Sequence, residues 1–373
     1  MADFSIRPAE PDDAAAVVAL SATVHPYLVR GVARTRLMIA EPPPGEDWAA
    51  FVAERDGKVA GWVSAYRNAR TAEPDFGQIS LLQVHPAARG RGIGSALFAA
   101  AAGHLRAAGI RRAAATATPE ALPFARRRGF EPLRELRYSV LDLAPPAGPG
   151  AAASERADLA ARAGLGAAAS ERVDPPAPVG LGAAASRRGD LAAPAGPGAA
   201  ASERADPPAP DASRGPTPGK ADATLDDVRL ISLRETTPEV LYAADVAAAA
   251  DEPGDVPPQP PSFTTWCYDV WQNPGLDHEI STAALIAGEI VAFSLLVRDG
   301  DRVWSDMTAT APAHRGRGLA RLVKTVALTR AAAAGVARAF TSNDETNLPM
   351  LAVNTRLGYR PVATQFSCVG PLG

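Results

Sequence analysis

Two stretches of this chain, QVHPAARGRGIG at residues 83–94 and TATAPAHRGRGLA at residues 308–320, carry nearly the same motif. Each follows a strand-like run and leads into a segment whose apolar residues recur at helical spacing. A glycine-rich turn at a helix start presents successive backbone N–H groups, and the positive end of the helix dipole favours a negative ligand there. Because a pyrophosphate fits such a cradle, the sequence predicts an anion-binding turn, and predicts it twice.

The elements around the two motifs follow the same order. In the first half, the patterns predict strands at 4–7, 49–54, 58–66, 78–84, 110–116 and 130–143, and helices at 12–20, 93–108 and 120–128. In the second half, they predict strands at 228–233, 280–286, 289–297, 302–310, 337–342 and 359–368, and helices at 238–250, 263–272, 316–334 and 347–356. The fold class is therefore α/β with a mixed, mainly antiparallel sheet, in two similar domains.

A change of composition separates these domains. Residues 144–224 are almost entirely Ala, Pro, Gly, Ser, Asp and Arg, and units such as GPGAAASERAD recur with a period of sixteen from Gly148, Gly164, Gly180 and Gly196. Units with so few large apolar residues cannot bury enough surface to offset the entropy of ordering the chain. We therefore expect an N-terminal domain at 1–143, a disordered linker with four repeats at 144–224, and a C-terminal domain at 225–373.

Composition limits the kind of partner and compartment. The 373 residues are 47% hydrophobic and carry a net charge of −3, which gives no overall field to attract nucleic acid or an anionic membrane. Only Cys267 and Cys368 are present, neither in a metal-ligand spacing, so we expect no disulfide scaffold and no metal. With no signal-peptide pattern and no long apolar run, the expected setting is the cytoplasm and the expected partners are small molecules.

The two motifs resemble the signature of the GNAT-type, acyl-CoA-dependent N-acetyltransferases. That signature is Arg or Gln, two residues, Gly, one residue, then Gly or Ala; Arg89, Gly92 and Gly94 match it, as do Arg315, Gly318 and Ala320. The segments RRRGFEP and TRLGYRP follow the two motifs at similar distances. The resemblance covers about residues 3–143 and 225–373, and it implies a tandem member with one CoA-binding turn in each half.

The resemblance also implies that the strand before each turn splays from its neighbour, so that main-chain groups bind the pantetheine arm and polarise the thioester carbonyl. On this basis, the expected contacts of acetyl-CoA are Leu82, Gln83, Val84, Arg89, Gly90, Arg91, Gly92, Ile93 and Gly94 in the first half, and Thr308, Ala309, Thr310, Arg315, Gly316, Arg317, Gly318, Leu319, Ala320 and Asn347 in the second. Two alternatives remain: turns that serve only packing, and a dinucleotide site. The latter would need a glycine fingerprint directly after a first strand and an acid about 20 residues further on, and the sequence has neither.

Members of the family commonly place Asn at the start of the late helix and Tyr seven residues later, where the Tyr protonates the leaving thiolate. The second half has Asn347 and then Asn354 at these positions, whereas the first half has Thr118 and Ala125. Neither half therefore has the tyrosine acid. Because a thiol with a pKa of about 8.5 leaves adequately with water as the proton source, catalysis remains feasible. Asn354 is a catalytic candidate, because an amide within an apolar helix needs a partner.

An amine must lose a proton before it attacks, so a base is required. Asp306, on the strand that leads into the second turn, is the first candidate, with Glu289 and Glu279 behind it. Trp266, Tyr268 and Trp271 belong either to an acceptor pocket or to the core.

The sequence therefore predicts transfer of an acetyl group from acetyl-CoA to a small-molecule or peptide amine by direct attack in a ternary complex. The C-terminal half is the expected catalyst. The alternative is a non-catalytic acyl-CoA-binding or scaffolding protein with two degenerate sites. The acceptor and the oligomeric state stay open.

Overall fold

The computed structural model describes residues 3–143, 227–249 and 255–373, so the predicted linker at 144–224 lies outside the described residues. The first half contains β1 (Ser5–Pro8), α1 (Ala14–Val24), α2 (Val32–Ala40), β2 (Ala49–Arg55), β3 (Lys58–Arg67), β4 (Phe76–Val84), α3 (Ile93–Ala107), β5 (Arg112–Ala117), α4 (Leu122–Arg126) and β6 (Glu131–Asp142). The second half contains β7 (Arg229–Ser232), α6 (Pro238–Ala249), α7 (Phe263–Trp266), the π-helical turn η7 (Cys267–Trp271), β8 (Thr282–Ile286), β9 (Glu289–Asp299), β10 (Arg302–Thr310), α8 (Leu319–Ala333), β11 (Arg338–Asp344), α9 (Leu348–Arg356) and β12 (Arg360–Pro371).

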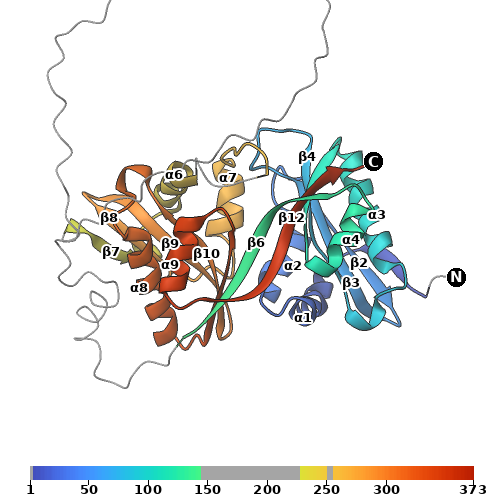
Figure 1. Cartoon of the computed structure of the whole chain (residues 1–373), viewed down its shortest axis with the longest axis horizontal. Coiled ribbons are helices and arrows are strands. Elements are labelled where there is room, and N and C mark those ends of the chain that lie inside the picture. The colour runs from blue at the N-terminus through green and yellow to red at the C-terminus, as the bar shows by residue number, and fades with distance from the viewer. Residues whose placement is uncertain (1–2, 144–226, 250–254) are drawn as a thin grey trace, which may run out of the picture.

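The strands form one continuous twelve-stranded sheet that runs through both halves in the order β1-β2-β3-β4-β5-β12-β6-β11-β10-β9-β8-β7 (Figure 1). Only the pairs β4–β5 and β10–β11 are parallel among those recorded. The predicted fold class, mixed α/β with a mainly antiparallel sheet in two domains, is confirmed.

Helices cover both faces of the sheet, as the alternation along β3 shows. Side chains on a strand point to opposite faces in turn. Trp62 packs in one cluster with Val17 and Leu20 of α1, whereas its neighbour Val63 packs in another with Leu97 of α3. Helices α1 and α3 therefore lie on opposite faces, and α3 brings the glycine turn that precedes it to the end of β4.

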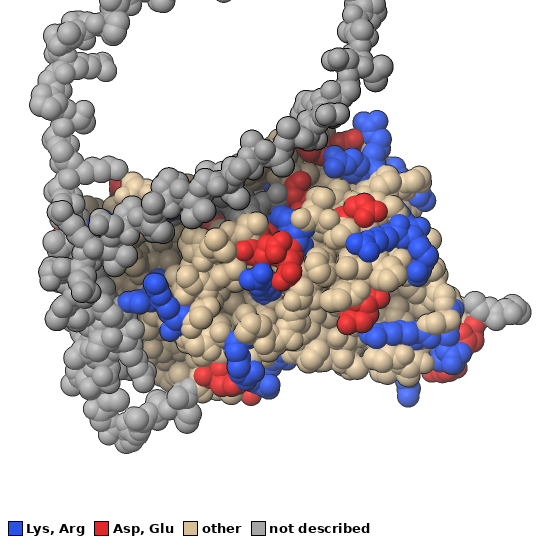
Figure 2. All heavy atoms as spheres, viewed as in Figure 1, with Lys and Arg blue, Asp and Glu red and all other residues tan. Residues whose placement is uncertain are grey.

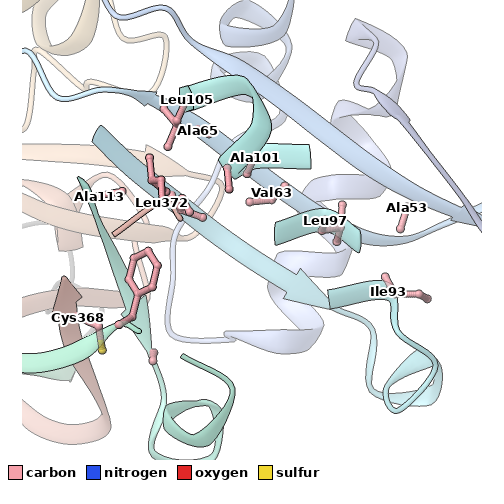
Figure 3. Close-up of a cluster of buried hydrophobic side chains, with 14 of the residues drawn as sticks. Ala53, Val63, Ala65, Ile93, Leu97, Ala101, Leu105, Ala113, Cys368 and Leu372 are labelled. Atoms are coloured by element: carbon pink, nitrogen blue, oxygen red, sulfur yellow. The ribbon is translucent and has the colours of Figure 1, made fainter. Parts of the chain in front are cut away.

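The last strands of the two halves are exchanged. Sequence reasoning assigned residues 130–143 and 359–368 as the final strands of their own halves. Instead, β6 pairs with β11 and β12 of the second half, and β12 pairs with β5 and β6 of the first half. In consequence, Cys368 and Leu372 from the C-terminal end are buried in the core of the first half, in the cluster that also contains Ala113 and Leu105 (Figure 3). The two halves therefore share both a sheet and parts of their cores.

Two elements differ from the sequence prediction. Helix α2 was not predicted, and only Thr35 within it is buried, so its pattern carried little helical periodicity. The predicted helix at 263–272 begins as the α-helix α7 and ends as the π-helical turn η7. Such turns are rare and recur at functional sites.

Candidate functional site

The glycine turns of both halves have the same local geometry. A short 3₁₀ turn follows the strand, and Gly92 with φ 87° and Gly318 with φ 79° then cap helices α3 and α8. Only glycine adopts this left-handed conformation at no steric cost. A Cβ at either glycine would meet no atom within 4 Å, so the space in front of each helix start is open. An anion can therefore approach the consecutive backbone N–H groups of each turn closely.

The signature arginines close these turns. The Nε of Arg89 donates to the carbonyl of Val84 at 3.3 Å, and the Nε of Arg315 donates to the carbonyl of Thr310 at 3.1 Å. The second arginine of each motif has a side-chain neighbour: Arg91 lies 3.4 Å from Asp3, and an Nη of Arg317 lies 3.1 Å from Nδ1 of His314. The first arginine thus ties the turn to the strand that precedes it, which sequence reasoning did not foresee.

The strand before each turn diverges from its parallel neighbour, as the resemblance implied. Pairing of β4 with β5 ends at Ile79 and Ala115, and pairing of β10 with β11 ends at Trp304 and Phe340. The main chain at 82–84 and 308–310 therefore has no partner in the parallel ladder, as a binding site for an extended amide-containing arm requires.

Each diverging strand also carries a β-bulge. In β4, Leu81 and Leu82 lie opposite a single residue of β3, and Leu81 has φ 52°. In β10, Asp306 and Met307 lie opposite a single residue of β9. A bulge changes the direction in which the side chains of a strand point, and bulges recur beside active sites. The bulge in β10 therefore determines the direction of the Asp306 side chain.

Both bulges reach one cavity of about 1390 Å³ between the two halves. The strands contribute Ser80 and Leu81 of β4 and Trp304 and Asp306 of β10 to its lining. The other lining residues include Arg30 in the loop between α1 and α2, Arg34 of α2, Glu46 before β2, and Asp269 of η7. Volume and position suit a substrate that contacts both halves.

Asp306 is an exposed residue that lines this cavity. Desolvation by the cavity wall raises the pKa of Asp306 above its usual range, although the positive charge of Arg70 acts in the opposite direction. Of the reserve candidates, Glu279 lines the cavity and forms an ion pair with Arg234 at 2.6 Å, whereas Glu289 begins β9 and is exposed.

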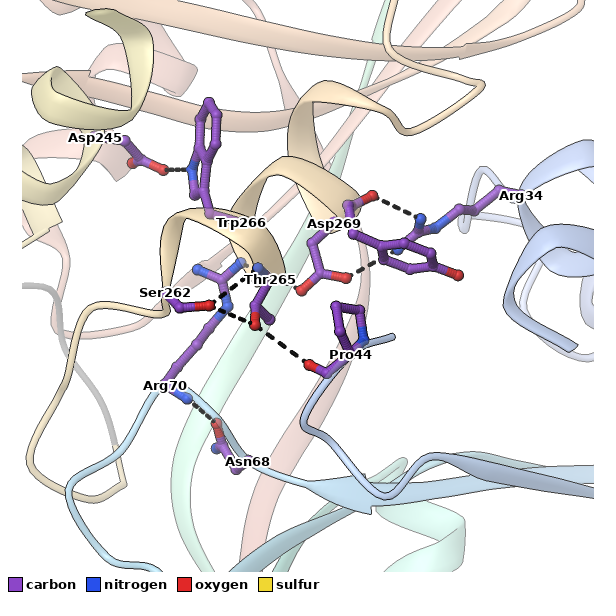
Figure 4. Close-up of polar contacts among 10 residues, drawn as sticks. Arg34, Pro44, Asn68, Arg70, Asp245, Ser262, Thr265, Trp266 and Asp269 are labelled. Atoms are coloured by element: carbon purple, nitrogen blue, oxygen red, sulfur yellow. Dashed lines mark hydrogen bonds and ion pairs between the residues drawn. The ribbon is translucent and has the colours of Figure 1, made fainter. Parts of the chain in front are cut away.

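Most charges of the cavity are paired across or within the halves. Arg34 donates to Asp269 at 3.0 Å and to the main-chain oxygen of Tyr268 (Figure 4). Asp277 lies 3.6 Å from Arg298. Three lining carboxyls, on Glu46, Asp299 and Asp306, form no ion pair within the described part of the chain. They are available to an ammonium group.

Sequence reasoning missed Glu46, Arg34 and Asp269. These residues have no counterpart in a repeated motif, and their segments meet where α2 and the loop before β2 contact α7 and η7. Glu46 follows the EPPPG run at 41–45, and no motif in the sequence around it marks it as a site residue.

The amide of Asn354 is buried within the second half. Its Oδ1 accepts from Nζ of Lys324 at 2.7 Å, and its Nδ2 donates to Oδ1 of Asn343 at 2.6 Å. Burial lowers the pKa of Lys324 to about 7. The side-chain oxygen of Asn347 accepts from the backbone N–H of Met350 at 3.3 Å and so caps α9. The partner that the Asn354 amide needs is thus a buried lysine, and a catalytic role of Asn354 stays a prediction.

The aromatic residues of α7 and η7 have different environments. Trp266 is 1% exposed and donates to Asp245 at 2.6 Å, so it belongs to the core (Figure 4). Tyr268 lies under the guanidinium of Arg34 at 4.7 Å, and its hydroxyl donates to the main-chain oxygen of Glu41. Trp271 packs edge-on against His278, which lines the cavity.

Acidic and basic side chains are interspersed over the face shown in Figure 2. Across residues 3–143, 227–249 and 255–373, His, Cys, Asp and Glu side chains form no group of three or more that could hold a metal ion. The helices described in these ranges include none with the length and hydropathy of a membrane span.

The profile of the Acetyltransferase (GNAT) family matches residues 24–130 and 248–359, more than half of the chain and once in each half. No curated protein sequence matches this chain.

Solved structures of tandem length have the same fold. A tandem GNAT protein from the clavulanic acid biosynthesis pathway is 18% identical, covers 99% of both chains and has a TM-score of 0.61. A GCN5-related N-acetyltransferase from Sphaerobacter thermophilus is 16% identical, covers 99% of this chain and 96% of its own, and has a TM-score of 0.57. A putative acetyltransferase from Pyrococcus horikoshii is 12% identical, covers 100% and 90% of the two chains, and has a TM-score of 0.51. With a family match in each half, the chain belongs to the GNAT acetyltransferase family and carries two GNAT domains in tandem.

Proposed function

We propose that this protein transfers an acetyl group from acetyl-CoA to an amine held in the central cavity, with the C-terminal half as the catalyst. The observation that carries the proposal is the junction of three features at β10: a glycine turn, a diverging strand, and a bulge whose Asp306 enters the cavity. In the first half, Ser80 and Leu81 take the corresponding place without a carboxyl.

The residues of the turn fit the proposed co-substrate. The open, left-handed glycines Gly316 and Gly318 and the start of α8 would hold the diphosphate, with Arg315, Arg317, Leu319 and Ala320 around them. The main chain at Thr308, Ala309 and Thr310 would receive the pantetheine arm, and Asn347 would flank it. Acetyl-CoA supplies the activated acyl group as a thioester.

The chemistry that the cavity would perform is direct attack. Asp306 would hold the ammonium form of the acceptor beside the β10 bulge. After loss of a proton, the amine nitrogen adds to the acyl carbon, and the carbonyl electron pair moves to oxygen. Backbone N–H groups of the diverging strand would stabilise this oxyanion. The carbon–sulfur bond then breaks, the sulfur leaves with the electron pair, and the nitrogen loses its second proton to the thiolate through water.

The first half keeps an equivalent cradle at Leu82, Gln83, Val84, Arg89, Gly90, Arg91, Gly92, Ile93 and Gly94, and we propose that it binds CoA without being the main catalyst. A second candidate function is acyl-CoA binding without transfer. Two features favour it: Ala125 occupies the position of the family's tyrosine in the first half, and the amide of Asn354, at the same position in the second half, is hydrogen-bonded to Lys324.

Two matched variants test the proposal. Gly318→Asp and Gly92→Asp each place a carboxylate and a strained torsion in one cradle. We expect Gly318→Asp to weaken acetyl-CoA binding at the second site at least tenfold, about 1.4 kcal/mol, and to abolish release of CoA thiol with a panel of amines. Gly92→Asp should lower turnover only modestly. Loss of turnover in Gly92→Asp alone would assign catalysis to the first half. Calorimetric binding without thiol release in the wild type would favour the binding protein.

A further inference from the structure

Glu46 is a buried carboxyl without a protein partner. Glu46 is 6% exposed and lines the central cavity. Within the described residues, its carboxyl forms neither a hydrogen bond nor an ion pair. A carboxylate largely shielded from bulk water is costly unless it has a counter-charge or a ligand, so its occurrence in a cavity wall needs a reason.

The second half holds the loop that carries Glu46. The hydroxyl of Tyr268 donates to the main-chain oxygen of Glu41 at 2.6 Å, and the hydroxyl of Thr265 donates to that of Pro44 at 3.3 Å (Figure 4). Arg34, from the helix before the loop, is fixed by Asp269. These contacts set the position of Glu46 against α7 and η7, on the side of the cavity that belongs to the second half.

The charges around Glu46 leave it unneutralised. The groups that face it are Arg34 of α2, Tyr66 of β3, Arg70 after β3, and Tyr268 and Asp269 of η7. Arg34 is committed to Asp269 at 3.0 Å, and Arg70 lies 3.9 Å from the same carboxylate. Burial, together with the negative charge of Asp269, therefore raises the pKa of Glu46 to about 7 against the two arginines.

From this geometry we propose that Glu46, supplied by the N-terminal half, is the proton acceptor for amines acetylated by the C-terminal half. The inference rests on the proposed function. The ammonium held at Asp306 gives one proton through water in the cavity to the Glu46 carboxylate, which lines the same cavity, and the free amine then attacks the thioester. The second N–H proton passes through water to the departing CoA thiolate, and Glu46 returns its proton to solvent. Neither half is a complete enzyme in this arrangement.

The test compares Glu46→Gln with Glu41→Gln in the full chain. Glu41 lies in the same loop, with an exposed side chain. We expect Glu46→Gln to lower kcat/KM at neutral pH by about 100-fold or more and to remove the acidic limb of its pH profile near pH 7, with acetyl-CoA affinity unchanged. Glu41→Gln should match the wild type. A readout independent of activity is stability: because a buried carboxyl with a raised pKa destabilises the fold once ionised, Glu46→Gln should unfold at a higher temperature than the wild type above pH 7, and not at pH 4.

The outcomes separate the two proposals. If Glu46→Gln keeps both the wild-type kcat/KM and the acidic limb, the role of Glu46 is wrong while the acetyltransferase assignment stands. If Glu46→Gln raises only the KM for the amine, Glu46 binds the acceptor and is not the base. If the wild type transfers no acetyl group to any amine, the proposed function and this inference both fail.

Discussion

At the scale of single residues, the sharpest contrast is between Asp306 and its counterpart Ser80, which line the same cavity from the two halves. Of these two residues, Asp306 alone carries a charge that can hold an ammonium. We expect Asp306→Asn to raise the KM for the amine and lower kcat/KM by about 10- to 100-fold, because a charge-assisted hydrogen bond is replaced by a neutral one. Steady-state rates with amine varied at saturating acetyl-CoA measure this effect. Ser80→Ala is the matched control, and an equal loss in that variant would contradict the assignment to the second half.

Lys324 provides a second prediction at this scale. Burial lowers its pKa to about 7, so between pH 7 and its ordinary value near 10.5 the unfolded chain binds a proton that the folded chain does not. Stability therefore rises with pH across this range, by up to about 1.4 kcal/mol per pH unit, and the gain disappears as pH falls toward 7. We expect Lys324→Met to remove this rise in urea unfolding at pH 7 to 10.

Lys58→Met is the control for this measurement, because Lys58 is an exposed residue at the β2–β3 turn. If Lys324→Met shows the same pH slope as the wild type and Lys58→Met, the ammonium of Lys324 remains charged when buried. The hydrogen bond to Asn354 would then stabilise an ion.

At the scale of elements, the exchanged strand β12 approaches the first half more closely than any side chain would allow. A Cβ at Gly370 would lie 2.6 Å from the oxygen of Gly129 and 2.8 Å from Cα of Phe130. Backbone atoms cannot move aside cheaply, so we expect Gly370→Ala to cost about 1–3 kcal/mol of unfolding free energy. Gly103→Ala in α3, where a Cβ meets nothing within 4 Å, should be neutral or stabilising. Equal stability of the two variants in urea unfolding would exclude a tight β12 contact.

The sequence was sufficient for elements whose signals are local. The turn at Asp56 and Gly57, with φ 52° and 69°, joins β2 and β3 as the Asp-Gly pair predicts, and the glycine turns begin α3 and α8 as expected. The strand exchange could not be predicted, because alternation tells which side chains face a core but not which strand lies beside it. The alternation of apolar and polar residues in β6 and β12 is compatible with a place in their own half or in the other half.

The same limit applies to the candidate site. Both glycine turns and Asp306 lie in or next to a repeated motif, so the sequence singles them out, and their roles stay predictions. Glu46 and Asp269 lie in segments that differ between the halves, and they meet only because the chain folds the halves against one another. The predicted linker at 144–224 lies outside the described residues and remains an expectation.

At the scale of the whole molecule, the exchange of β6 and β12 predicts that the halves unfold together. Each exchanged strand lies between two strands of the other half, so neither sheet can open without removing a strand from its neighbour. Leu97 is fully buried in the core that also contains Cys368 and Leu372. We expect Leu97→Ala to cost about 2–5 kcal/mol and to lower protection from hydrogen exchange by a similar free energy in β11 of the second half, which it does not touch.

Leu328→Ala is the reciprocal variant, because Leu328 is buried in the second half against Val303 and Ala339. Its loss should appear as faster hydrogen exchange in β5, which pairs with the exchanged strand β12. Two domains that merely sit on a common linker would confine each effect to its own half and give two thermal transitions, one of them unchanged in each variant. A single transition that moves in both variants is the expected result, because the strands that close each half belong to the other.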